Sequence, residues 1–195
     1  MMTAPRSFLF LLASGRDGGN TETLAREAAA HLPEHTAQRW LRLADHPLPA
    51  FEDIRHAGEG PHQPSTDNER LLLDATLAAT DIVIASPVYW YSVSSSAKLY
   101  LDYWSNWLRI PDLGFKARMG EKTYWSVSAL ADEDPAKAEP LLGTLRLSAE
   151  FFGARWGGGL LGNGSWPGDV RADTSALDRA RTFFAAEHSL APALS

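Results

Sequence analysis

Residues 8–32 read FLFLLASGRDGGNTETLAREAAAHL: an apolar run, a polar turn and an amphipathic segment, in that order. The six apolar residues 8–13 predict a strand covered on both faces, as parallel sheets require. A helix is expected to begin near Asn20, a favourable N-cap, with Glu22 at the positive end of the helix dipole. Leucine and alanine then recur at helical spacing as far as Leu32. The stretch therefore predicts a strand, a tight turn and a helix.

The turn, residues 14–19, is rich in glycine, which lets a ligand approach the backbone closely. Free amides at the start of a helix attract phosphate. The turn matches neither the Walker A pattern nor the dinucleotide pattern GxGxxG. We therefore expect a loop that holds one terminal phosphate mainly through neutral donors; a connecting loop without a ligand is the alternative.

Composition bounds the class of protein. A chain of 195 residues with 45% hydrophobic residues is long enough for one well-buried core, so one domain over residues 1–195 is expected. A net charge of −6, without a cluster of lysine or arginine, argues against a nucleic-acid partner. The absence of cysteine excludes disulfides, thiolate zinc sites, cysteine-ligated iron–sulfur clusters and a cysteine nucleophile.

We expect a soluble cytoplasmic protein without a membrane partner. No segment approaches the roughly 20 apolar residues of a membrane span. Arg6 and the apolar residues after it imitate a short secretory signal, but the apolar core is of minimum length. Cleavage there would also remove the first predicted strand, which contradicts an otherwise coherent pattern.

The alternation of strands and helices continues along the chain and predicts an α/β fold. Further strands are expected at residues 36–43, 82–86, 122–128 and 155–161, and further helices at 68–79, 94–108, 135–152 and from 173 or 174. Strict alternation implies a parallel sheet with helices on both faces, and five strands suggest the order 2-1-3-4-5. Ligands bind such sheets beyond the carboxyl ends of the strands, where the strand order reverses. Residues 14–21 should therefore lie beside residues 87–92.

An aromatic loop follows the third strand. Pro87 ends that strand, because proline cannot donate to a sheet ladder, and Tyr89, Trp90 and Tyr91 come next. Three consecutive aromatic residues beside a strand end predict a surface against which a flat group lies. A hydrophobic corner or a subunit contact is the alternative. A ligand with a phosphate at one end and a flat ring at the other would fit both loops.

Residues 45–67 carry four prolines and show no sustained period, so we expect either a mobile connection or part of a site or subunit contact. His46, His56 and His62 in this segment lack a metal-ligand spacing and are expected to be solvated, so no metal site is predicted.

The predicted helix 94–108 is unusually aromatic. Lys98 and Asp102, four residues apart, can brace its surface. Its aromatic density exceeds what one core face normally needs, which predicts that part of it packs against another subunit in a homodimer or homotetramer.

These segments resemble the flavodoxin-like NAD(P)H-dependent FMN reductases. The matching pieces are SGRDGGNT (14–21), LADHPLPAFED (43–53) and SPVYWYSVSSSAKLYLDYW (86–104). The resemblance implies a flavodoxin-like three-layer sandwich built on a five-stranded parallel sheet. Trp90 and Tyr91 stand where the family often has asparagine or glycine, and Ser128 and Ala129 stand where it often has consecutive glycines.

Residue by residue, the resemblance implies an FMN site formed by two loops and a strand end. Phosphate and ribityl contacts are expected from Ser14, Arg16, Gly19, Asn20 and Thr21, isoalloxazine contacts from Pro87, Val88, Tyr89, Trp90 and Tyr91, and further contacts from Ser128 and Ala129.

The implied activity is an NAD(P)H-dependent FMN oxidoreductase. A nicotinamide, from NADPH or NADH, would pass hydride to FMN, and a small acceptor would follow: a quinone, an azo or nitro compound, or free flavin. Since the cofactor carries this chemistry, no catalytic acid or base is expected. A flavodoxin-type electron carrier without a nicotinamide site is the alternative, and a phosphate-ester hydrolase or sugar-phosphate binder on the same fold is a third.

Overall fold

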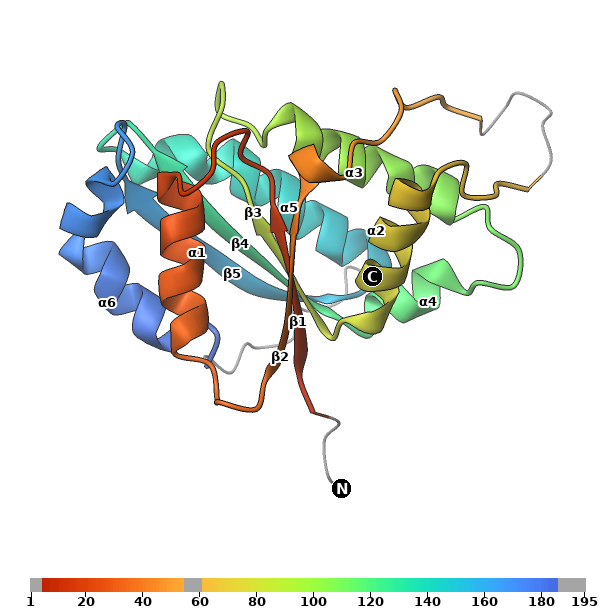
Figure 1. Ribbon diagram of the computed structural model, residues 1–195, viewed down its shortest axis with the longest axis horizontal. Helices are drawn as coiled ribbons and strands as arrows, with labels where there is room; N and C mark the ends of the chain where they lie inside the picture. Colours follow the sequence, from red (N-terminus) through yellow and green to blue (C-terminus); the bar gives the residue numbers. More distant parts are fainter. Residues whose placement is uncertain (1–4, 55–60, 186–195) are drawn as a thin grey trace.

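The computed structural model describes residues 5–54 and 61–185. Five parallel strands form one sheet: β1 (Ser7–Leu12), β2 (Ala37–Arg42), β3 (Asp81–Ala85), β4 (Thr123–Leu130) and β5 (Arg155–Asn163). Their order is β2-β1-β3-β4-β5, which confirms the predicted order and the flavodoxin-like arrangement (Figure 1). The first change of direction in this order lies between β1 and β3, so the loops after these two strands meet at the carboxyl edge.

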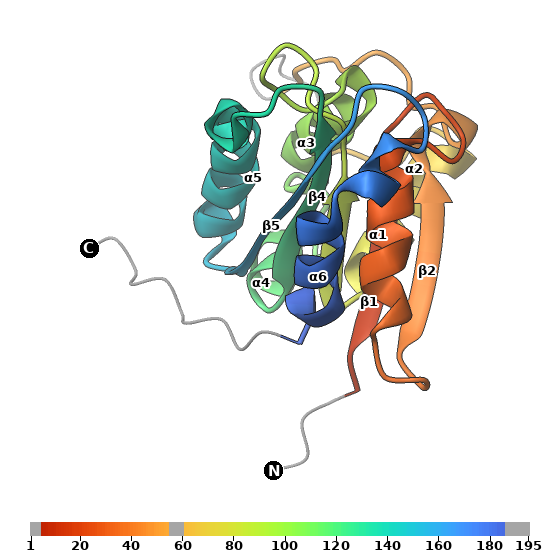
Figure 2. The same cartoon turned by 90° about the vertical axis from the view of Figure 1, so that its left-hand side faces the viewer.

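Helices cover both faces of the sheet. They are α1 (Asn20–Ala30), α2 (Asp67–Ala78), α3 (Ser95–Trp107), α4 (Phe115–Gly120), α5 (Glu139–Phe152) and α6 (Thr174–Phe183), with short 3-10 turns at residues 43–45, 135–138 and 169–172. Helices α1 and α6 lie side by side on one face, and α2 to α5 cover the other (Figure 2). The five predicted helices are present, and α4 was missed. It has only six residues, of which Phe115 and Met119 are buried.

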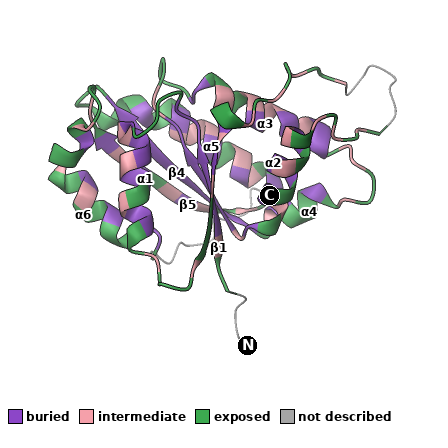
Figure 3. Cartoon of the chain, in the orientation of Figure 1, coloured by how far each residue is buried: buried purple, intermediate pink, exposed green. Residues whose placement is uncertain are grey.

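The strand residues alternate between two apolar layers. Phe8, Phe10 and Leu12 pack under α1 and α6, whereas Leu9 and Leu11 face the opposite helices. The central strands are buried on both sides (Figure 3), as expected when helices cover both faces of a parallel sheet.

Glycines shape the last strand. A Cβ atom at Gly157 would clash with the indole of Trp125, and one at Gly159 would clash with Leu142. The consecutive glycines that weaken the strand signal in residues 155–161 therefore make room for large side chains of neighbouring elements. The strand extends to Asn163, two residues beyond the predicted end.

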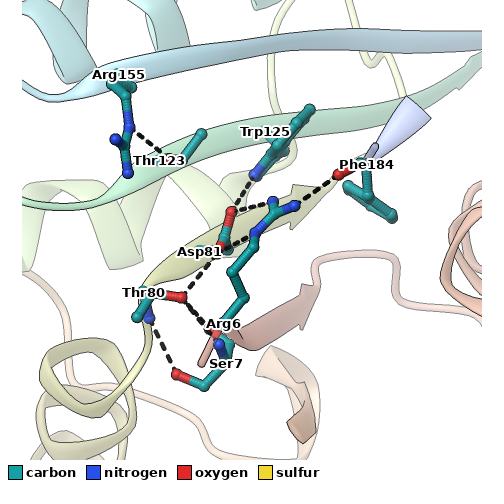
Figure 4. A network of polar contacts seen from close by, with 8 residues as sticks. All are labelled: Arg6, Ser7, Thr80, Asp81, Thr123, Trp125, Arg155 and Phe184. Carbon is teal, nitrogen blue, oxygen red and sulfur yellow. Dashed lines mark hydrogen bonds and ion pairs between the residues drawn. The ribbon is translucent and has the colours of Figure 1, made fainter. Parts of the chain in front are cut away.

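A polar cluster closes the amino edge of the sheet, opposite the edge where the loops meet (Figure 4). The buried carboxylate of Asp81 accepts hydrogen bonds from Arg6, at 2.6 and 3.1 Å, and from Trp125 Nε1 at 2.9 Å. Arg6 also donates to the backbone oxygen of Phe184, at 2.7 Å. The cluster joins β1, β3 and β4 to the end of α6.

The aromatic residues of α3 pack inside this chain. Tyr100, Tyr103, Trp104 and Trp107 are buried in this chain's own core. Their density is therefore accounted for within this chain, because four helices on this face supply enough partners to cover them, and the predicted contact of α3 with another subunit stays a prediction without this support. The predicted surface pair is present, with Lys98 Nζ 2.5 Å from Asp102 Oδ1.

The segment after β2 packs along α3. Tyr103 donates its hydroxyl to the oxygen of Pro49 at 3.1 Å, and Phe51 packs against the core. His62 is not solvated as predicted: its Nε2 lies 2.5 Å from Oε1 of the fully buried Glu69. A buried carboxylate needs such partners, and Glu69 also accepts from Trp107 Nε1 at 3.0 Å.

His46 is partly buried, and His56 lies outside the described residues. In the part of the chain that the structure describes, no helix is long and apolar enough to cross a membrane.

Candidate functional site

A cavity of about 290 Å³ opens at the carboxyl edge of the sheet. It brings together most of the predicted site residues, namely Ser14, Arg16, Gly19, Asn20, Thr21, Pro87, Val88, Tyr89 and Ala129. Ala131, Gly164, Ser165 and Pro167 complete the lining, and the sequence reasoning missed them. The loops after β1 and β3 therefore meet as the switch-point rule predicts, and a third loop, after β5, joins them.

The loop after β1 leaves the start of α1 open. Gly19 is the N-cap residue and has no side-chain oxygen, so no side chain caps this helix. Gly18 adopts a left-handed φ of 61°, and its N–H donates to Glu22 at 3.1 Å. The amides of the first helical turn, next to the hydroxyls of Ser14 and Thr21, are arranged to receive an anion.

Asn20 is not the N-cap that the sequence predicts. Its Oδ1 accepts hydrogen bonds from Gly168 N at 2.9 Å and Val170 N at 3.4 Å, and its Nδ2 donates to the oxygen of Trp166 at 2.9 Å. The side chain therefore fastens the start of α1 to the loop after β5. Gly164 passes so close that an added Cβ atom would lie 2.7 Å from Asn20 Nδ2.

The described charged side chains around the loop after β1 form ion pairs, with the exception of Arg16. Arg42 lies 2.6 Å from Glu22 and 2.7 Å from Asp17, and it also donates to the backbone oxygen of Arg16 at 3.0 Å. Burial raises the pKa of Glu22, but hydrogen bonds from Arg42, Gly18 N and Arg26 outweigh burial and hold this pKa below its usual value. Among residues 5–54 and 61–185, the guanidinium of Arg16 has no hydrogen-bond or ion-pair partner, so one positive charge is left at the cavity.

The aromatic loop is a tight hairpin. Tyr89 and Ser92 exchange two backbone hydrogen bonds, both 3.0 Å long. The two residues between them, Trp90 and Tyr91, have φ values of 48° and 64°. Positive φ at both central positions is the pattern of a type I′ turn, which normally takes Asn-Gly. The strain of a non-glycine residue there is about 1–2 kcal/mol.

This strained hairpin is anchored at its base, because Val88 donates its N–H to the oxygen of Ala129 at 3.1 Å. Trp90 is 93% exposed, and Tyr89 and Tyr91 are about half exposed. Tyr89 lines the cavity, whereas Trp90 and Tyr91, although predicted as site residues, are not among the residues that line it.

Ser128 does not reach the cavity. It is fully buried in β4, and its Oγ lies 3.3 Å from Ser126 Oγ. The strand runs two residues beyond its predicted end, so Ser128 keeps the alternation of the strand and points into the packed layer. Ala129, its neighbour, faces the cavity as predicted.

Two larger hollows lack this combination of groups. One of about 400 Å³ lies between the segment after β2 and residues Tyr103 and Asn106, and one of about 650 Å³ is an apolar groove between α3 and α5. Neither has an open helix start beside an aromatic loop. In the described part of the chain, no group of three or more His, Asp or Glu side chains could hold a metal ion.

The chain matches known proteins over most of its length. Residues 7–134 match the sequence profile of a family described as NADPH-dependent FMN reductase. The chain is 33% identical over 167 residues to YwqN of Bacillus subtilis (strain 168), which is described as an NAD(P)H-dependent FMN-containing oxidoreductase. This match covers 85% of the present chain and 89% of YwqN.

Solved structures share the fold. A Trp repressor binding protein from Bacillus subtilis superposes with a TM-score of 0.72 and 25% identity, covering 93% of this chain and 99% of that one. An NAD(P)H:quinone oxidoreductase from Methanothermobacter marburgensis superposes with a TM-score of 0.68 and 15% identity, covering 95% and 98%.

Proposed function

Because the chain belongs to the NADPH-dependent FMN reductase family, we propose that it binds FMN in the cavity at the carboxyl edge and reduces it with a nicotinamide. A small acceptor then takes the electrons. The observation that carries this proposal is the meeting of an uncapped helix start and an aromatic hairpin at one cavity. FMN has a phosphate at one end and a flat ring at the other.

The residues present fit FMN at the phosphate end. The first-turn amides of α1, the hydroxyls of Ser14 and Thr21 and the guanidinium of Arg16 supply donors and one positive charge. Arg42 is already paired with Glu22, so it braces the loop and does not compete for the phosphate.

They also fit at the ring end. Pro87, Val88 and Tyr89 supply apolar and aromatic surface, and the small Ala129 leaves space beside them. A volume of about 290 Å³ is near the lower limit for small-molecule pockets.

Bound FMN supplies the redox chemistry, by accepting a hydride from the nicotinamide and passing electrons to the second substrate. The task of the chain is to hold and orient the reactants. Arg16 and Tyr89 are the ionisable side chains among the cavity-lining residues, and neither has a partner arranged for proton transfer. No residue is therefore assigned as a catalytic acid or base.

The acceptor is proposed to be a small flat or electron-poor molecule: a quinone, an azo or nitro compound, or free flavin. The quinone oxidoreductase that shares the fold supports the first of these. Because both reactants exchange electrons with the flavin ring, the nicotinamide and the acceptor would use the same face in turn.

The homodimer or homotetramer remains a prediction. Its original basis, the aromatic residues of α3, is gone, but Leu108, Leu147 and Phe151 are exposed along the groove between α3 and α5. Light scattering after size-exclusion chromatography tests this. A monomer at micromolar concentration would contradict it.

Anaerobic reduction tests the proposed function. Protein reconstituted with FMN should show flavin absorbance after desalting, and NADPH or NADH should bleach it. Retained FMN that neither donor reduces would instead support the electron carrier, especially if slow chemical reduction accumulates a stable blue species. Failure to retain FMN would remove both candidates.

A further inference from the structure

Exposed aromatic side chains gather around the cavity. Among the described residues, the exposed aromatic side chains are those of Tyr89, Trp90, Tyr91, Phe151 and Trp166. All but Phe151 belong to loops that line the cavity. Trp90 belongs to the hairpin after β3, whereas Trp166 lies beside the start of α1, on the loop after β5.

Trp166 is held firmly through its backbone. Its N–H donates to Asp169 Oδ2 at 2.7 Å, and its oxygen accepts from Asn20 Nδ2 at 2.9 Å and from Asp169 N at 3.1 Å. Its two neighbours, Ser165 and Pro167, line the cavity, but the indole does not. The indole is 77% exposed and therefore stands on a fixed support just outside the space assigned to FMN.

We propose that Trp166 binds the adenine base of the nicotinamide dinucleotide donor, an assignment that rests on the proposed function. FMN has one flat ring, and the hairpin at the opposite end accounts for it. The donor has a flat group at each end and phosphates between them. Its nicotinamide must lie on the flavin ring, near Tyr89 and Trp90, so its second base must lie outside the FMN cavity.

The surface beyond the phosphate end of the cavity suits that base. Base–aromatic stacking needs only a presented flat face, which an exposed and supported indole provides. Arg16, which the proposed function assigns to the FMN phosphate, lines the cavity near this end, so the positive charge there also lies on the side where the phosphates of the donor would pass. Asn20 is then a positioning residue, because it holds the backbone of Trp166 in place.

Donors with and without the adenylate test the assignment. In steady-state assays with FMN-loaded protein, Trp166→Ala should raise KM for NADH and NADPH about tenfold and leave kcat unchanged. It should leave KM for reduced nicotinamide mononucleotide, which lacks the adenine, unchanged. Trp166→Phe should retain most of the affinity, and Phe151→Ala, which removes an exposed ring elsewhere, should behave as the unaltered protein.

A binding measurement gives a second readout. Calorimetric titration of ADP-ribose into FMN-loaded protein should show about tenfold weaker binding for Trp166→Ala. Unchanged KM values for NADH and NADPH, or an equal rise in KM with the mononucleotide, would overturn the assignment and leave the proposed function intact. If the unaltered protein oxidises none of the three donors, the proposed function fails, and the assignment with it.

Discussion

Replacing Asn20 with alanine should loosen the site and destabilise the fold together. The substitution removes two hydrogen bonds of 2.9 Å, to Trp166 O and from Gly168 N, and a weaker one of 3.4 Å from Val170 N. A hydrogen bond of good geometry contributes about 1 kcal/mol net, and the long one contributes little. The better helix propensity of alanine offsets this loss of stability by a few tenths of a kcal/mol. We therefore expect the free energy of unfolding to fall by about 1–2 kcal/mol.

The same change should weaken FMN binding. The loop after β5 supplies Gly164, Ser165 and Pro167 to the cavity, and Asn20 is its fastening to α1. If the loss of these hydrogen bonds lowers the free energy of FMN binding by the same 1–2 kcal/mol as the free energy of unfolding, the dissociation constant for FMN should rise about fivefold to thirtyfold, since 1.4 kcal/mol corresponds to tenfold. Urea unfolding of the apoprotein and titration of flavin fluorescence measure the two effects separately.

Asn68→Ala is the matched control. Asn68 lies in the first turn of α2 and donates a single exposed hydrogen bond to Pro47 O, at 3.0 Å, away from the cavity. Its loss should change stability by less than about 1 kcal/mol and leave FMN affinity unchanged. An Asn20→Ala protein as stable as the unaltered one would refute the hydrogen-bond argument. A destabilised variant that binds FMN normally would show that the loop after β5 does not shape the site.

Three further predictions concern the fold and the hairpin. Arg6→Ala should lower the free energy of unfolding by about 2–3 kcal/mol, because the buried carboxylate of Asp81 loses its charged partner. The effect is smaller than for a fully buried pair, since Arg6 is half exposed. A change below about 0.5 kcal/mol in urea unfolding would contradict this prediction. Burial lowers the pKa of Lys122 to about 8 from 10.5, so the unfolded chain binds more protons between these values and stability should rise with pH there. The Lys122→Met protein, compared at pH 7.5 and 9.5, should lack that rise, and equal slopes for the two proteins would refute the assignment. Trp90→Asn combined with Tyr91→Gly should stabilise the apoprotein by about 1–2 kcal/mol, because a type I′ turn favours Asn-Gly; a lower melting temperature would show that the two rings stabilise the hairpin.

The parts of the fold that local pattern determines were predictable. Buried runs such as residues 8–13 and 82–86 mark strands because a parallel sheet covered on both faces needs continuous apolar residues. Because strands alternate with helices, only a few orders of the strands in the sheet are possible. Ligands bind such sheets at the carboxyl ends of the strands, where the strand order reverses, and this rule correctly brought Ser14 and Tyr89 to one cavity.

Features that depend on distant partners were not predictable in this way. The helical aromatic residues Tyr100 and Trp107 suggested a subunit contact, but Tyr100 hydrogen-bonds to Thr76 of α2 and Trp107 packs against Phe115 of α4, so their partners belong to the same chain. His62 gave no signal of its burial, because its partner, Glu69, is a charged residue in the first turn of a helix, where exposure is the usual expectation. Ser128 was misplaced because the length of β4 decides which way its side chains point.

Asn20 shows why a favourable local role can yield to a distant one. A cap hydrogen bond from asparagine contributes about 1 kcal/mol, and local sequence predicts it. In the fold, Gly19 takes the cap position, and Asn20 bonds a loop 146 residues later in the chain. A side chain that capped the helix would occupy the amides that we propose for the FMN phosphate. The helix start therefore remains open, and the amide side chain that could have closed it instead holds the loop after β5, which forms the third wall of the cavity.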